Sequence, residues 1–445
     1  MKKRKIAAIG LVVLLISGVS VAYVASPTIH EGQVGEAPEL GRAGPFPIGT
    51  NVQQFALDNR TEITGWGAVT GNLKETERAL SVRFWYPAKA ASGKPTQYKH
   101  VMRPPGKDPV ALSSQGMALS DAEALTDAKY PLVLMSHGFG GWDTQFSNLA
   151  EHIASQGYIV ASINHADKPI ENAASFFLSF GNVLVDRTLD QRQILSMIID
   201  KAQSETPAYA AQIDTDNIAL VGYSMGGYGA IASAGAAYDF ANDPMTNIPD
   251  DAQERMISAT QKPLPIKALV TFAPWGGQPD SRVWNAENLA KIKVPALIVS
   301  GNQDDVVNFE EGVKWLYDKM TGSDRYMLVY REARHNIVGN HFDLDPDTAF
   351  TTAEFLKEPV WRSDRLNSIN QHFVTAFLDM TLKGESDKAS YLTVPTENSN
   401  DSAWPIGFGE QLNGKTAGAE QPDHWPGFQR RWAVGLELYH RTPDQ

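Results

Sequence analysis

The chain has 445 residues, of which 42% are hydrophobic and 20% are charged, and this composition is typical of a globular protein rather than a disordered or fibrous one. Acidic residues outnumber basic ones by 51 to 39, and the net charge of −12 argues against nucleic acid or an anionic membrane surface as the main partner. Because the chain has no cysteine, disulfides, thiolate catalysis, thiolate-bound zinc and lipidation on cysteine are excluded.

The N-terminal residues 1–25 combine a basic start, Lys2 to Lys5, with an uncharged apolar stretch from Ile6 to Ala25. This pattern predicts either a signal peptide, with a small-residue cleavage site at Ser20-Val21-Ala22, or an uncleaved membrane anchor. Both alternatives place the remainder outside the cytoplasm, as a secreted, periplasmic or membrane-anchored protein. Residues 26–47 are rich in Pro, Gly and Glu and are expected to form a linker.

The next segments predict an α/β domain over residues 48–383. Two strands are expected at 62–69 and 80–86, followed by irregular surface loops over 88–129. From residue 132 onward, apolar runs alternate with segments of helical periodicity, which indicates a mostly parallel sheet flanked by helices. The expected strands are 132–135, 158–163, 218–223, 266–271, 296–300 and 326–330, and helices are expected after residue 146, over 187–202, after Ser224 and over 363–382.

Three segments do not fit this alternation and are expected to be lid-like insertions, near 166–185, 238–265 and 336–361. Residues 384–445 form a C-terminal extension rich in Pro, Gly and Trp. Since tryptophan is costly to leave in water, we expect the extension to pack on the catalytic domain, with a strand over 433–439.

The motif that organises the chain is Gly222-Tyr223-Ser224-Met225-Gly226, directly after an apolar run. It reads Gly-x-Ser-x-Gly, a nucleophile elbow in which a strand ends, the chain turns sharply at the serine and a helix begins. The turn requires Gly or a very small residue two positions before and after the serine. A helix of small residues follows and could lie close against a sheet.

A serine nucleophile needs a histidine base and a carboxylate that orients it, and after an elbow these follow in the order acid, then histidine. Asp304 follows the strand expected at 296–300, and His335 follows the strand expected at 326–330. Asp305 is the alternative acid and His341 the fallback base. The spacing Gly-x-x-Asp-x-x-Val favours Asp304, because the valine can anchor the turn in the core.

An oxyanion intermediate needs backbone N–H donors. We expect one from Met225 and the other from Phe139 in the loop Ser136-His137-Gly138-Phe139-Gly140-Gly141. His137 is expected to brace this loop by hydrogen bonding rather than to act as a base.

Asp343, Asp345, Asp347 and Glu354 occupy positions 1, 3, 5 and 12 of a calcium-loop pattern. Thr348 stands where that loop needs Gly, and Pro346 lies inside it, so a solvated acidic loop is the alternative and no metal is assigned.

These motifs carry a family resemblance over residues 55–383. The elbow, the Ser136–Gly141 loop, and the runs Arg83–Pro87, Leu149–Tyr158 and Asp186–Asp190 resemble α/β-hydrolases, in particular esterases like dienelactone hydrolase and platelet-activating-factor acetylhydrolase. The resemblance implies the α/β-hydrolase fold, ester hydrolysis and no cofactor. The acetylhydrolases carry their acid one strand earlier, where Leu269–Ala273 has none; the position of Asp304 follows dienelactone hydrolases and cutinases, which argues against phospholipid acetylhydrolase activity.

Ala273-Pro274-Trp275 is similar to the cutinase segment whose tryptophan packs on substrate, so Trp275 is expected to bind substrate, together with Trp142 and Tyr223; a core role for Trp275 is the alternative. The sequence as a whole predicts a serine esterase acting on a small-molecule, lipid or polymeric ester. An amidase, peptidase or acyltransferase on the same triad, or a catalytically silent binding protein, stays open, as does the oligomeric state.

Overall fold

The computed structural model describes residues 36–64, 72–89, 95–202, 207–404, 406, 411–415, 423–429 and 431–445. The expected N-terminal signal or anchor segment, residues 26–35 of the expected linker and the end of the strand expected at 62–69 lie outside these residues.

The strands are β1 (Ile48–Thr64), β2 (Asn72–Pro87), β3 (Pro95–Met102), β4 (Val110–Ser120), β5 (Tyr130–Ser136), β6 (Ile159–Asn164), β7 (Ile213–Tyr223), β8 (Ile266–Phe272), β9 (Ala296–Gly301), β10 (Arg325–Tyr330) and β11 (Leu436–Arg441). The α-helices are α3 (Ser147–Ser155), α4 (Ala173–Lys201), α5 (Met225–Ser233), α6 (Asp250–Gln261), α7 (Ala286–Leu289), α8 (Lys314–Lys319), α9 (Phe350–Leu356) and α10 (Ser363–Leu382). Short 3₁₀ turns and one π turn connect them: η1 (Glu39–Gly41), η2 (Ala210–Gln212), η3 (Met245–Asn247), η4 (Pro279–Ser281), η5 (Phe309–Val313), η6 (Ser386–Tyr391) and η7 (Ser399–Asp401).

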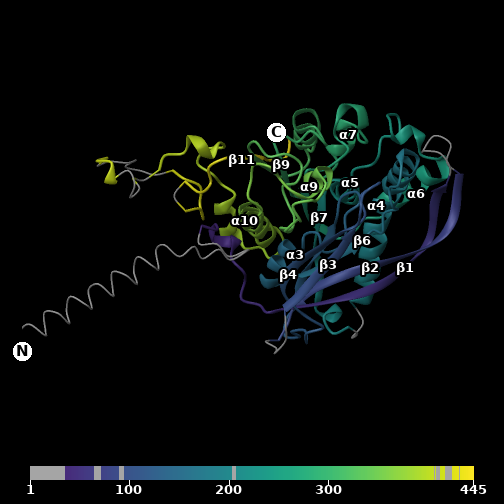
Figure 1. Ribbon diagram of the computed structural model, residues 1–445, viewed down its shortest axis with the longest axis horizontal. Coiled ribbons are helices and arrows are strands. Elements are labelled where there is room, and N and C mark those ends of the chain that lie inside the picture. Colours follow the sequence, from purple (N-terminus) through teal and green to yellow (C-terminus); the bar gives the residue numbers. More distant parts are fainter. Residues whose placement is uncertain are drawn as a thin grey trace, which may run out of the picture.

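In the described part of the chain the strands form one 11-stranded sheet with the order β11-β10-β9-β8-β7-β5-β6-β2-β1-β4-β3 (Figure 1). Strands β6, β5, β7, β8, β9 and β10 are parallel, and antiparallel strands extend the sheet at both ends. The mostly parallel sheet that the sequence predicts is therefore confirmed. The parallel strands end at a common edge, which brings the loops after β5, β7, β9 and β10 together.

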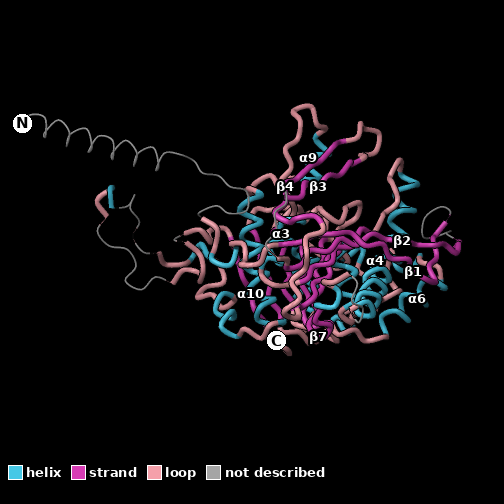
Figure 2. The backbone as a smooth tube through the Cα atoms, turned by 90° about the horizontal axis from the view of Figure 1, so that it is seen from below, coloured by secondary structure: helices cyan, strands magenta, loops and turns pink. Residues whose placement is uncertain are grey.

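Helices cover both faces of the sheet. Figure 2 shows the strands between α10 on one side and α4 with α6 on the other. Every residue of β5, β9 and β10 is buried, as expected of strands covered on both faces. In α10, a stripe formed by Leu366, Ile369, Phe373 and Phe377 recurs at helical spacing and packs into the main core.

The loop expectation for residues 88–129 is wrong, because this segment contains the antiparallel pair β3 and β4. The inward positions of β4 include Gly116 and Ala118, so the strand lacks the large alternating side chains by which strands are recognised in a sequence. Next to α9, the hairpin forms a projection with its own small core, made by Leu112, Trp142 and Phe342 (Figure 2).

The insertion expected at 166–185 is mostly the first half of α4, which begins 14 residues before the helix that the sequence predicts. Asn172 caps it in a capping box with Ser175. The other two expected insertions contain α6 and α9. The last part of the expected linker is also ordered: η1 packs on α10, where the Leu40 N–H donates to His372 Nδ1 (3.2 Å).

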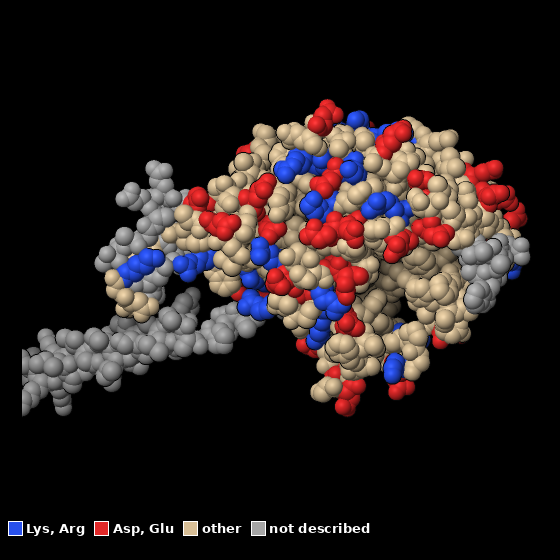
Figure 3. All heavy atoms as spheres, turned by 90° about the horizontal axis from the view of Figure 1, so that it is seen from above, with Lys and Arg blue, Asp and Glu red and all other residues tan. Residues whose placement is uncertain are grey.

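The C-terminal residues pack on the main domain, notably through a buried tryptophan and an added strand. Trp425 is buried and packs edge-on against Phe373 of α10. The expected strand at 433–439 is β11, shifted to 436–441, which pairs antiparallel with β10 and ends the sheet. In the face shown in Figure 3, acidic and basic side chains are interspersed over the surface. No helix among the described residues is long and apolar enough to cross a membrane.

We predict that β11 stabilises the sheet through the apolar side chains on its buried face. Leu438 is 2% exposed, so Leu438→Ala should lower the free energy of unfolding by about 2–5 kcal/mol, measured by urea denaturation. Val434→Ala, at a 41% exposed position just before the strand, is the control and should change stability by less than about 0.5 kcal/mol. Equal effects of the two substitutions would contradict a packing role for β11.

Candidate active site

Ser224 lies on a strained turn between β7 and α5. Its φ of 51° and ψ of −115° place a non-glycine residue in the left-handed region, a conformation that costs of order 1–3 kcal/mol and is typical of functional sites. The Ser224 N–H donates to Phe272 O in β8 (2.9 Å), and Ser224 O accepts from Trp275 N–H (3.2 Å). The turn is therefore fixed from the neighbouring strand and its following loop.

The two glycines of the motif are required by close backbone contacts. A Cβ on Gly222 would lie 2.3 Å from Gly226 O, and one on Gly226 would lie 2.0 Å from Ser136 O. Both distances are far below van der Waals contact. The expectation that these positions need glycine is therefore confirmed, and the second contact presses the turn against the end of β5.

Asp304 and His335 lie together as the sequence predicts. Asp304 Oδ2 and His335 Nδ1 are 2.8 Å apart, and the Asp304 side chain is 0% exposed. Asp304 Oδ1 accepts from the N–H groups of Val306 and Val307, and the buried Val307 anchors the turn in the core. The adjacent Asp305 is 62% exposed and pairs with Arg334 instead, and these hydrogen bonds lower the Asp305 pKa. Geometry thus favours Asp304 over Asp305 as the histidine's partner.

His335 packs on the residue that precedes Ser224. The Tyr223 and His335 rings have centroids 5.1 Å apart, and the Tyr223 hydroxyl donates to Asn336 Oδ1 (3.1 Å). Burial raises the pKa of Tyr223, so this hydroxyl stays neutral. Among the described residues, the Ser224 hydroxyl and His335 Nε2 make no hydrogen bond. His341, the fallback base, pairs with Asp343 at the surface.

The Ser136–Gly141 loop passes beside Ser224, since a Cβ on Gly138 would lie 3.2 Å from Ser224 Cβ. Met225 is the first residue of α5. In the part of the chain that the structure describes, the N–H groups of Phe139 and Met225 donate no hydrogen bond. Both groups therefore remain available to an incoming acceptor next to the serine.

His137 braces this loop, as predicted. Its Nδ1 lies 2.7 Å from Gly138 O, and its Nε2 accepts from the His165 N–H (3.1 Å). These contacts require a neutral ring with the proton on Nδ1. Burial, reinforced by Arg187 and His165, lowers the pKa of His137 well below its usual value, so His137 stays neutral.

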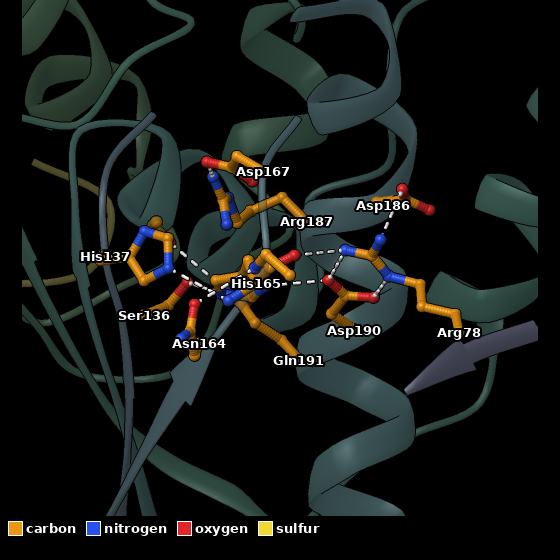
Figure 4. A network of polar contacts seen from close by, with 12 residues as sticks. Arg78, Ser136, His137, Asn164, His165, Asp167, Asp186, Arg187, Asp190 and Gln191 are labelled. Carbon is orange, nitrogen blue, oxygen red and sulfur yellow. Dashed lines mark hydrogen bonds and ion pairs between the residues drawn. The ribbon is translucent and has the colours of Figure 1, made fainter. Parts of the chain in front are cut away.

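Sequence reasoning missed a buried polar network behind the loop (Figure 4). Asp190 of α4 accepts from Arg78 of β2 (2.7 Å) and pairs with Arg60 of β1 (2.8 Å), while His165 Nδ1 lies 2.9 Å from Asp190 Oδ2. The signal was present in the run Asp186–Asp190, which places charged residues at i, i+1 and i+4 within the buried middle part of α4. Buried charges of this kind are retained only when they are paired.

Within this network Ser136, His165 and Asp190 are hydrogen-bonded in the order serine, histidine, acid. Ser136 Oγ and His165 Nε2 are 2.7 Å apart. All three side chains are buried, and Ser136 is the last residue of a central strand, so a substrate carbonyl has no approach to its hydroxyl. This trio is a packing element of the loop rather than a second catalytic centre.

The aromatic residues expected to bind substrate are mostly packed. Trp142 is 3% exposed and stacks on His100 with ring centroids 4.0 Å apart, so in this structure it belongs to the small core of the projection. Trp275 is buried beside the elbow and packs edge-on against Phe180 (5.4 Å). Tyr223 supports His335. The open alternative of a core role therefore describes Trp275 in this structure.

The residues of the calcium-like pattern do not converge on a common site, because two of them pair with other side chains. Glu354 lies in α9 and pairs with Arg334 (3.2 Å), and Asp343 pairs with His341. Among the described residues, no cluster of three or more acidic or histidine side chains is placed to hold a metal ion.

Two family models match consecutive parts of the chain. The model described as platelet-activating factor acetylhydrolase, isoform II, matches residues 44–206, and that of the prolyl oligopeptidase family matches residues 202–358. The first covers the Ser136–Gly141 loop and the buried network, and the second covers Ser224, Asp304 and His335.

Individual relatives agree with this. Platelet-activating factor acetylhydrolase of Bos taurus is 29% identical over 143 residues, which is 24% of this chain and 32% of that protein, and the Gallus gallus enzyme is 41% identical over 51 residues, 12% of each chain. The chain thus matches about a third or less of these relatives' length. A solved structure, a ferulic acid esterase from Streptomyces cinnamoneus, covers 80% of this chain and is itself covered to 94%, with a TM-score of 0.52 and 19% identity. The predicted α/β-hydrolase fold is confirmed.

We predict that the buried neutral histidines make stability depend on pH. Burial lowers the pKa of His165 to about 4 and those of His152 and His372 to about 3, and it lowers that of His137 well below 6.5. Below about pH 6.5 the unfolded chain binds protons that the folded protein does not, so the free energy of unfolding should fall from pH 7 to 5.5. Urea denaturation at several pH values measures this slope.

His372→Gln should reduce the slope by up to about one proton, most at pH 5.5, because burial lowers the His372 pKa to about 3 and the folded state therefore keeps the ring neutral in this range. Val434→Ala, at an exposed position and without any titratable group, is the control and should leave the slope unchanged. A stability that stays flat from pH 7 to 5.5 would contradict the assignment of these histidines as neutral.

Proposed function

We propose that this α/β-hydrolase is a serine esterase, with Ser224 as nucleophile, His335 as base and Asp304 as the residue that orients the histidine. The observation that carries the proposal is the buried Asp304–His335 pair (2.8 Å), packed through Tyr223 against a strained Ser224 turn. Strain at a nucleophile that is held between two strands is expected for a site of covalent catalysis.

The reaction follows from these positions. His335 Nε2 takes the Ser224 proton as Oγ attacks the ester carbonyl, while Asp304 holds the Nδ1 proton and stabilises the imidazolium. The tetrahedral oxyanion accepts hydrogen bonds from the N–H groups of Phe139 and Met225. The histidine then gives its proton to the leaving alcohol, and the acyl-enzyme is hydrolysed by a water that His335 activates. No cofactor takes part in these steps.

An apolar acyl group fits the surroundings of Ser224. Phe139 contacts Phe176 and Phe180, each with ring centroids 5.7 Å apart, and Phe180 contacts Trp275. Phe176 is 39% exposed at the N-terminal end of α4, so the cluster offers an aromatic surface beside the second oxyanion donor. The structural likeness to a ferulic acid esterase supports an ester of an aromatic or otherwise apolar acid.

Cleavage of a peptide or amide bond is the second candidate, because the prolyl oligopeptidase family model covers all three triad residues. Comparing p-nitrophenyl esters with the matching p-nitroanilides distinguishes the two. We also propose, from the basic and apolar N-terminal sequence, that the enzyme acts outside the cytoplasm, secreted or anchored to the membrane.

We predict that Ser224→Ala abolishes hydrolysis of p-nitrophenyl esters and labelling by a fluorophosphonate probe, because Ser224 supplies the atom that forms the acyl-enzyme. Thermal unfolding should be nearly unchanged, which separates loss of the nucleophile from loss of the fold. Full esterase activity in a folded Ser224→Ala variant would overturn the proposal.

We predict opposite results for two adjacent carboxylates. Asp304→Asn should lower kcat by about 10³- to 10⁴-fold, because the amide favours the wrong histidine tautomer. Asp305→Asn, the matched control, should stay within about threefold of the parent, since Asp305 is exposed and pairs with Arg334. The reverse pattern would move the acid to position 305.

A further inference from the structure

The turn after β6 places a buried carboxylate beneath the oxyanion loop. Ala166 has a φ of 50°, the left-handed region that non-glycine residues rarely adopt. This turn directs Asp167 towards the loop, where Asp167 Oδ2 accepts from the Gly140 N–H (2.9 Å) with a side chain that is 5% exposed. The strained conformation of Ala166 thus positions Asp167 for its contact with the Gly140 N–H.

Arg187 of α4 meets the same carboxylate. Its Nη2 donates to Asp167 Oδ2 (2.8 Å) and reaches Gly138 O (3.4 Å), and the guanidinium side chain is 1% exposed. Burial alone would raise the pKa of Asp167, but Arg187, the hydrogen bond from the Gly140 N–H and the other groups that face the carboxylate together lower the pKa, so the carboxylate is ionised.

These contacts fix both peptide units that flank Phe139. The carbonyl of the Gly138–Phe139 peptide is held by His137 Nδ1 (2.7 Å) and Arg187, and the N–H of the Phe139–Gly140 peptide is held by Asp167. A peptide unit is planar and trans, so its carbonyl and N–H point in opposite directions. Holding the Gly138 carbonyl towards the protein interior therefore turns the Phe139 N–H outwards.

His137, which holds the Gly138 carbonyl, is itself held in place by further hydrogen bonds. Figure 4 shows the contacts running from His137 through His165 to Asp190 and Arg78. Because His137 Nε2 accepts the His165 N–H, its proton must lie on Nδ1, where it can hold the Gly138 carbonyl. The network therefore favours the one arrangement of the loop in which the Gly138 carbonyl and the Gly140 N–H are both hydrogen-bonded.

We propose that Asp167 and Arg187 are positioning residues for the Phe139 oxyanion donor. Asp167 holds the loop, and Arg187 both holds the Gly138 carbonyl and neutralises the carboxylate that would otherwise repel the developing oxyanion. This inference rests on the proposed esterase mechanism, and it extends that mechanism to two residues that contact no substrate.

The test measures kcat and KM for a p-nitrophenyl ester, and the affinity for a boronic acid that mimics the tetrahedral intermediate, in Asp167→Asn and Arg187→Gln. A misplaced donor should lower kcat and boronate affinity together by about 10- to 100-fold, with KM within about threefold. Arg187→Gln should have the larger effect, because it leaves an unpaired carboxylate near the oxyanion.

Two further variants keep the test decisive. Asp167→Glu retains the ion pair but displaces the oxygen that holds Gly140, so it should lower kcat even if the neutral variants fold poorly. Glu437→Gln removes one carboxylate from the Arg331–Glu437 pair (2.8 Å) between β10 and β11, and its kcat should stay within about twofold.

Variants of Asp167 and Arg187 that fold and keep the parent kcat and boronate affinity would overturn the inference, as would changes in melting temperature alone. The Ser224→Ala variant separates this outcome from failure of the proposed function: if it stays active, the mechanism fails, and if it is inactive while these variants are normal, only the positioning role fails.

Discussion

The close approach of the Ser224 turn to the end of β5 is the constraint on which the site depends. It is possible only because Gly222 and Gly226 carry no side chain: a Cβ on Gly226 would lie 2.0 Å from Ser136 O. This contact brings the start of α5 and the Ser136–Gly141 loop together beside Ser224, and each of them carries one of the two proposed oxyanion donors. A single steric requirement thus places the proposed nucleophile and both proposed donors next to one another.

Around this constraint the protein buries several charged side chains in pairs. Arg60, Arg78 and Arg187 face Asp167, Asp186 and Asp190 between the antiparallel strands, α4 and the two loops after β5 and β6. Pairing in a buried place is weak evidence for stability, because desolvation offsets most of the attraction. The clearer consequence of this pairing is structural specificity. Hydrogen bonds between guanidinium and carboxylate groups form in few geometries, so these pairs specify one arrangement of the loop that carries Phe139.

The comparisons divide the chain in a way that matches its structure. The likeness to platelet-activating factor acetylhydrolases covers the sheet's first half, the Ser136–Gly141 loop and the buried network, and its family model ends before Ser224. The proposed triad lies in the part that resembles prolyl oligopeptidases, with the proposed acid, Asp304, after β9. The resemblance to acetylhydrolases implies an acid one strand earlier, after β8, and the order of the strands explains how the acid can lie after β9 instead. Strands β8, β9 and β10 are adjacent and parallel, so a carboxylate at the end of β8 or of β9 lies near the same histidine.

The sequence by itself determined the parallel core, the glycine requirement at the elbow, and the pairing of Asp304 with His335. The periodicity of apolar residues, the elbow motif and the order of acid and histidine along the chain can all be observed directly in the sequence. It did not reveal the first half of α4, or the pair β3 and β4, where the inward positions of β4 include the small residues Gly116 and Ala118. The tertiary structure alone decided which tryptophans are packed and that Asp167 and Arg187 meet at the loop. Their partners are separated by tens of residues, and hydrogen bonds between such groups are set by the order of strands in the sheet, which no local pattern records.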